Sequence, residues 1–299
     1  LIESWLNTHT TEHNRGKVLA VYTFITLASM AAGQIFVNAG PVESSTPFSL
    51  AVLFMALAIV PIGLTRKIAP TPIESTSPSF RLLYQRSHSA FVGAILSGLV
   101  TGSFWSLGAV FASYYSDSLA GVSWFMMVAI GGGALFQYPI GWLSDRIDRR
   151  WILILLSLGG ALTAVAVGLS VQSSWHLVMV FLFGAMVMPI YAISLATAAD
   201  IAGDDEFVAI GTSILLLNAL GAAVAPLYLG QLMVLFGPTA LFNAFALTCL
   251  LFSLLLLGLS RTPSLVSVEE QTPFSAAAPE VAPASFELDP RGAEDGEPE

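Results

Sequence analysis

The chain has 299 residues, of which 55% are hydrophobic and 10% charged, and its mean hydropathy is +0.77. This composition excludes an ordinary soluble helical domain, which needs polar outer faces on its helices. The net charge of −9 does not indicate an acidic core, because nine of the 20 acidic residues and one of the 11 basic residues lie beyond residue 261. No basic groove is visible, so we expect no nucleic-acid partner. Because Cys249 is the single cysteine, no disulfide can form within the chain, and we expect no metal cluster.

Long apolar stretches divide the chain into eight candidate membrane spans. They cover residues 17–39, 48–65, 88–113, 121–142, 151–171, 176–199, 207–236 and 239–260. A helix of about 20 apolar residues crosses the ~30 Å hydrocarbon core of a bilayer. Most of these stretches reach that length without a charge in their middle. We therefore predict an all-α polytopic protein embedded in a lipid bilayer.

The basic residues lie only in every second connection between these spans. They are Arg15 and Lys17 before the first span, Arg66, Lys67, Arg81 and Arg86 after the second, Arg146, Arg149 and Arg150 after the fourth, Arg261 after the eighth, and Arg291 near the end. The connections at 40–47, 114–120, 172–175 and 237–238 contain none. Loops rich in Lys and Arg stay in the cytoplasm. The pattern therefore predicts the orientation of the chain, with its C-terminal tail cytoplasmic.

A short sequence occurs twice along the chain. Residues 33–41 (GQIFVNAGP) and residues 230–238 (GQLMVLFGP) are identical at five of nine positions. Each copy ends a span at a Gly-Pro loop on the side opposite the basic loops, and six spans separate equivalent points of the two copies. The repeat unit is therefore six helices. Two six-helix units of the same orientation resemble the major facilitator superfamily.

A loop motif strengthens this resemblance. Residues 141–150 (GWLSDRIDRR) resemble the superfamily's cytoplasmic motif Gly-x-x-x-Asp-Arg/Lys-x-Gly-Arg-Arg/Lys, with Asp148 at the usual glycine. A small first residue lets neighbouring helices approach closely, and the Asp can pair with the Arg residues or face a helix N-terminus. We interpret these residues as a gating latch that breaks when the two halves rock: Gly141, Asp145, Arg146, Arg149 and Arg150. The alternative is an ordinary positive-inside loop with a helix-capping Asp.

The resemblance implies a division of the chain into four parts. Residues 1–65 would be the end of helix four with helices five and six, so that helices one to three and most of helix four are missing. Residues 66–87 would be the cytoplasmic linker, and residues 88–260 the complete second half. Residues 261–299, rich in Pro, Ala, Glu and Ser, are expected to be a disordered acidic tail.

Two further segments resemble the YcaD-type group of bacterial facilitators. They are residues 3–7 (ESWLN) with 14–19 (NRGKVL), and residues 189–196 (PIYAISLA) followed by Ala199-Asp200. This narrower resemblance implies a location in the bacterial inner membrane. The group resembles drug and sugar permeases, so a small-molecule substrate is expected.

In this superfamily the first, fourth, seventh and tenth helices line a central cavity. Our candidates for its lining are Phe104, Trp105, Gln137, Met188, Tyr191 and Asn218. Aromatic and methionine side chains suit lipophilic compounds, and a buried amide is costly unless it is bonded. Pro189 frees a backbone carbonyl and can hinge the tenth helix. The alternatives are ordinary packing for the aromatic residues and bonding between helices for the amides.

The spans have no ionisable group in their middle, although proton-coupled carriers usually hold one there. Glu3, at the inner end of the fourth helix, is the nearest candidate for coupling. Its alternative role is a loop ion pair with Arg15. We expect no cofactor, with a proton gradient as the candidate energy source.

These features together predict a secondary active transporter that works by alternating access and exports lipophilic or drug-like compounds. We expect no enzyme, because the chain has no HExxH spacing and no nucleophile elbow. It also has no nucleotide-binding loop, so no ATP-binding domain is expected in this chain. The alternatives are a membrane sensor or receptor with the transporter fold, and an inactive truncated transporter.

Overall fold

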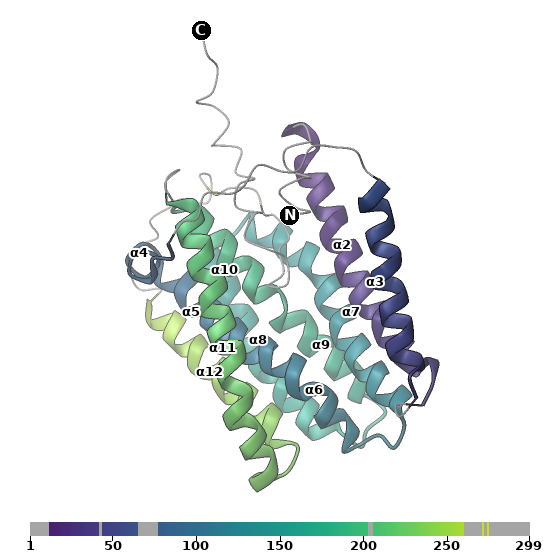
Figure 1. Ribbon diagram of the computed structural model, residues 1–299. Helices are drawn as coiled ribbons and strands as arrows, with labels where there is room; N and C mark the ends of the chain where they lie inside the picture. Colours follow the sequence, from purple (N-terminus) through teal and green to yellow (C-terminus); the bar gives the residue numbers. More distant parts are fainter. Residues whose placement is uncertain are drawn as a thin grey trace.

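The computed structural model describes residues 12–41, 44–64, 77–202, 206–259, 271 and 274. Their regular secondary structure is helical, as Figure 1 shows, and none of the described residues lies in a strand. The elements are α2 (Glu12–Phe36), the 3-10 turn η1 (Val37–Ala39), α3 (Thr46–Leu64), α4 (Phe80–Arg86), α5 (His88–Ser97), the π-helix η2 (Gly98–Gly102), α6 (Ser103–Ser113), α7 (Leu119–Ser144), α8 (Arg149–Ser170), α9 (His176–Val187), α10 (Pro189–Ala199), α11 (Phe207–Phe236) and α12 (Ala240–Leu259). The predicted all-α fold is confirmed.

Within this part of the chain, six segments are long and apolar enough to cross a membrane. They are His88–Ser113, Leu119–Ser144, Arg149–Leu169, His176–Ala199, Ala209–Phe236 and Ala240–Leu259. The last six predicted spans match them to within about two residues at each end. The first two predicted spans are also helical, as α2 and α3, but their apolar stretches are the shorter segments Ile25–Ala39 and Thr46–Pro61. The chain is an integral, multi-pass membrane protein.

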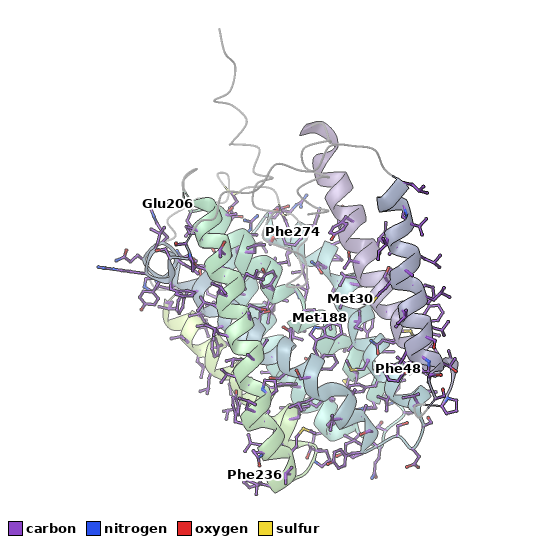
Figure 2. The ribbon with its side chains drawn as sticks, in the orientation of Figure 1. Met30, Phe48, Met188, Glu206, Phe236 and Phe274 are labelled. Carbon is purple, nitrogen blue, oxygen red and sulfur yellow. The ribbon has the colours of Figure 1, made fainter. Side chains whose placement is uncertain are left out.

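Successive spans run in alternating directions between two ends of the molecule, with α5, η2 and α6 forming one span and α9 and α10 another. Figure 2 shows Phe48 and Phe236 at one end, and Glu206 and Phe274 at the other. We call the second end the inner end. It contains the loop between α7 and α8 and the loop between α10 and α11, and the distribution of basic residues predicts that it faces the cytoplasm.

The six segments from residue 88 to residue 259 pack together, and we call them the six-helix unit. Within it, α8 lies against α9 and α12, α7 lies against α9, and α5 with η2 lies against α10 and α11. Its core is rich in aromatic rings, and the fully buried rings are Phe104, Phe111, Phe183, Phe242 and Phe245. A second cluster at the inner end joins α4, α5, α10 and α11 around the buried Leu83.

The first two helices lie outside this unit. α2 packs along α7, and α3 runs beside α2 (Figure 1). At the end of α2, the centroids of the Phe36 and Phe54 rings lie 5.1 Å apart. Most described side chains of α3 are exposed and apolar. Such a surface is suited to contact with lipid tails, because these are as apolar as leucine side chains.

Three local features refine the predicted spans. The helix is interrupted at Pro189, where the sequence suggested a hinge: α9 ends at Val187 and α10 begins at Pro189. The π-helix η2 was not predicted, and neither was α4, which lies within the expected linker. α4 is held by Leu83, which is fully buried, and by an Arg86–Glu206 ion pair of 3.0 Å that reaches the start of α11.

Candidate functional site

The inner end contains an ion-pair cluster centred on Arg149, whose side chain is 1% exposed. The guanidinium donates from Nη1 to Asp200 Oδ1 at 2.6 Å and to the Ala196 carbonyl oxygen at 2.8 Å. Its Nη2 donates to Asp145 Oδ1 at 3.1 Å. Arg149 with Asp145 and Asp200 is called the Arg149 cluster below. It joins the start of α8 to the inner ends of α7 and α10.

The loop from α7 to α8 is short because Asp148 caps the start of α8. The Asp148 side chain accepts a hydrogen bond from the Arg150 backbone N–H at 2.9 Å, which satisfies one of the unpaired donors of the first turn. Asp148 has a φ of −51°, so this turn does not require the glycine that the family motif usually has there. The loop is tight, and Arg149 enters the first turn of α8 with its side chain directed inward.

The other predicted motif residues have different surroundings. Arg146 is exposed, donates to the Trp142 carbonyl oxygen at 2.9 Å and lies 3.7 Å above the Trp142 ring centroid. Arg150 is half-buried. Gly141 lies one turn before Asp145 and is buried. The structure therefore brings Asp145 and Arg149 together, as the motif predicts, and directs Arg146 away from them.

The electrostatics of the Arg149 cluster make its members interdependent. One buried guanidinium faces two carboxylates, of which Asp200 is 5% exposed and Asp145 is 35% exposed. When two opposite charges are buried together, their attraction and hydrogen bonds offset the free energy lost by removing them from water. A buried charge that has lost its partner has no such compensation. Removing one member therefore leaves the others in an unfavourable environment. These ion pairs connect helices of the six-helix unit, so they fix the inner rim of that unit.

Asp200 is a functional candidate that the sequence analysis did not select. It was noted there only as part of a resemblance. One signal was available: Asp200 follows a span whose inner end must lie on the same side as residues 145–150. A charge at that end has few ways to be satisfied other than pairing with the motif's arginines.

The predicted cavity residues separate into two groups. Phe104 is 1% exposed and lies between the Phe125 and Phe183 rings, with centroid distances of 6.0 and 5.9 Å. Tyr191 is 2% exposed and belongs to the inner cluster around Leu83. Packing accounts for both positions. Trp105 and Met188 are half-buried at the margin of the core, so they remain candidates for contact with a substrate.

The two predicted amides, Gln137 and Asn218, are both buried. Asn218 lies on α11 where η2 packs against it, and a side chain at Gly98 would overlap the Asn218 backbone. The Asn218 Nδ2 group has no hydrogen-bond partner within the described part of the chain. Because an unsatisfied buried donor costs about 1–3 kcal/mol, Asn218 is the stronger polar candidate for contact with a ligand or water.

Glu3 and the side chain of Arg15 lie outside the residues that the structure describes. The proposed coupling or loop ion pair therefore stays a prediction.

Comparison with known proteins places this site in a family. The sequence profile of the Major Facilitator Superfamily matches residues 90–288. An uncharacterized MFS-type transporter named YcaD from Escherichia fergusonii is 26% identical over 269 residues, covering 88% of this chain and 69% of that protein. The uncharacterized MFS-type transporter Ent638_1421 from an Enterobacter species is 27% identical, covering 86% of this chain and 67% of that protein. No solved structure matches the chain significantly.

The profile match covers most of the six-helix unit and includes the whole Arg149 cluster. Together with the apolar spans, it identifies the chain as a membrane transporter that belongs to the major facilitator superfamily.

Proposed function

We propose that this chain is a secondary active transporter that exports lipophilic or drug-like small molecules by alternating access across the bacterial inner membrane. The Arg149 cluster is the observation that carries the proposal. Alternating access needs rims that stay rigid while they separate, and Arg149 holds the inner ends of α8 and α10 together through Asp200 and the Ala196 carbonyl oxygen.

Asp145 is the member of the cluster that is suited to respond to movement. It is 35% exposed, whereas Arg149 and Asp200 are buried, and it ends α7, the helix against which α2 packs. Movement of α2 along α7 would therefore act on the helix that carries Asp145. We propose that the Asp145–Arg149 pair is the latch that changes during the transport cycle.

The apolar character of the spans supports the proposed substrate class. No Asp, Glu, Lys or Arg lies in the middle of a described span, so a substrate with a localised charge would have no counter-charge there, whereas a lipophilic compound or a cation with delocalised charge needs none. Trp105, Met188 and the unsatisfied amide of Asn218 offer adaptable apolar contact and one hydrogen-bond donor. A proton gradient is the proposed source of energy.

We expect Asp145→Asn to lower export about tenfold, because a hydrogen bond between charged groups contributes about 1.5 kcal/mol or more. The measurement is uptake of a fluorescent lipophilic cation into inside-out membrane vesicles after a proton gradient is imposed, scaled to the amount of protein in the membrane. Asp117→Asn is the matched control, since Asp117 is exposed in the loop at the opposite end. Unchanged uptake with Asp145→Asn would rule out the latch. No uptake of any tested compound by the unmodified chain would contradict the proposed function.

Trp105→Ala tests the substrate-contacting side of α6. We expect the ratio of uptake rates for a large and a small lipophilic cation to change several-fold. Removing an aromatic contact weakens the binding of a compound that uses this contact by about 0.5–2 kcal/mol. The amount of protein in the membrane should change less, because Trp105 is only half-buried. A fall in protein amount with an unchanged ratio would assign Trp105 to packing.

A further inference from the structure

The C-terminal segment contacts the inner end of α7 through Phe274. The Phe274 backbone N–H donates to Asp145 Oδ1 at 2.8 Å, across 129 residues of sequence. Its ring lies over Gly141, where a Cβ atom would overlap three ring atoms of Phe274, its nearest neighbours at that position. Figure 2 shows Phe274 at the inner end. The motif glycine therefore leaves space for this ring, which differs from the predicted role of letting helices approach.

The ring of Phe274 is half-buried and makes two kinds of apolar contact. It packs against the aromatic-rich core of the six-helix unit and also against the inner cluster around Leu83. Phe274 thus connects the two clusters at the inner end. The nearby Gln271 is half-buried as well, with its Oε1 atom shielded from solvent. A residue in an acidic, proline-rich segment that was expected to be disordered is held by both polar and apolar contacts.

We propose that Gly141 and Asp145 form a docking site for an aromatic residue of a peptide segment, and that its occupant is Phe274 of this chain. The site provides a carboxylate oxygen for a backbone N–H and a flat glycine surface for a ring. Asp145 Oδ1 accepts from both Phe274 and Arg149 Nη2. Phe274 therefore holds this carboxylate in its ion-paired position.

The docking is tested by the reactivity of a cysteine placed next to Phe274 in the sequence. Ser275→Cys leaves Phe274 intact, and the chain's own Cys249 is fully buried and gives little background. The measurement is the rate of maleimide labelling in inside-out membranes that contain the full chain. We expect Gly141→Ala to increase that rate about tenfold, because its Cβ displaces the ring and the hydrogen bond to a charged acceptor is lost with it.

Two further variants make the test specific. Gly131→Ala is the matched control on the same helix, because a Cβ at Gly131 has open space, and it should leave the labelling rate unchanged. Phe274→Ala should increase the rate as much as Gly141→Ala, and the two changes together should add little, since both remove one contact. Equal labelling with and without Gly141→Ala and Phe274→Ala would overturn the docking.

The same assay distinguishes the chain's own segment from another occupant. Protection of the cysteine should persist in the purified protein, where no other protein is present. Protection that disappears on purification would overturn the self-docked segment and point to a separate partner. The readout needs no substrate, so its failure would be distinct from a failure of the proposed transport.

Discussion

Replacing Arg149 with methionine is expected to lower the free energy of unfolding by about 3–5 kcal/mol, the usual cost of breaking a buried ion pair by removing one partner. Asp200, which is 5% exposed, would lose its guanidinium partner, and the Ala196 carbonyl would lose a donor. Asp145 should contribute less to the loss, because it is 35% exposed and can bind water. The measurement is thermal unfolding of the purified protein in detergent, followed by tryptophan fluorescence.

Two variants show whether this loss comes from the buried charge. Arg146→Met makes the same change in the same loop, but Arg146 is exposed, so it should cost no more than about 1 kcal/mol. Adding Asp200→Asn to Arg149→Met removes the buried charge that lost its guanidinium partner, and it should restore part of the stability. If Arg149→Met were as mild as Arg146→Met, the Arg149 cluster would not hold the three helices together.

Replacing Gly132 with alanine is expected to lower the free energy of unfolding by about 1–3 kcal/mol, the usual cost of overpacking. A Cβ at Gly132 in α7 would overlap the Phe181 carbonyl oxygen in α9, and a Cβ at Gly184 in α9 would overlap the Ala129 carbonyl oxygen in α7. The two backbones are therefore in contact from both sides. A backbone carbonyl cannot rotate away as a side chain can, so the helices must separate.

The neighbouring residue supplies the control for this prediction. Gly131→Ala changes the same helix by the same methyl group, but into open space. It should be neutral, or stabilising by up to about 1 kcal/mol, because alanine is the better helix former. The same unfolding measurement would contradict the close approach of α7 and α9 if Gly131→Ala were the more damaging of the two.

The positions of the helices could be predicted because a span must be long and apolar to cross a bilayer. That requirement placed the segments 88–113 and 176–199 at the ends observed in the structure. The side of each helix that faces the protein could not be predicted. These helices are apolar on nearly all sides, so the pattern does not distinguish the buried Phe104 from the half-buried Trp105.

Only the part of the candidate site that lies close together in the sequence could be predicted. The motif identified Asp145 and Arg149, because their spacing within one loop is visible in the sequence. Asp200 lies 51 residues from Arg149 and Phe274 lies 129 residues from Asp145, so their contacts depend on how helices pack. The π-helix η2 was not predictable either, because its hydrogen-bond register leaves no signal in composition.

The most direct measurement of whether the Arg149 cluster takes part in transport is uptake of a lipophilic cation by Asp200→Asn in inside-out vesicles, at equal amounts of protein in the membrane. Asp200 is buried and reaches the proposed latch through Arg149. Uptake should fall about tenfold, as for Asp145→Asn, and the double variant should be little slower than either single variant, because both act on one guanidinium. Uptake equal to that of Asp117→Asn would contradict a role for the cluster in transport.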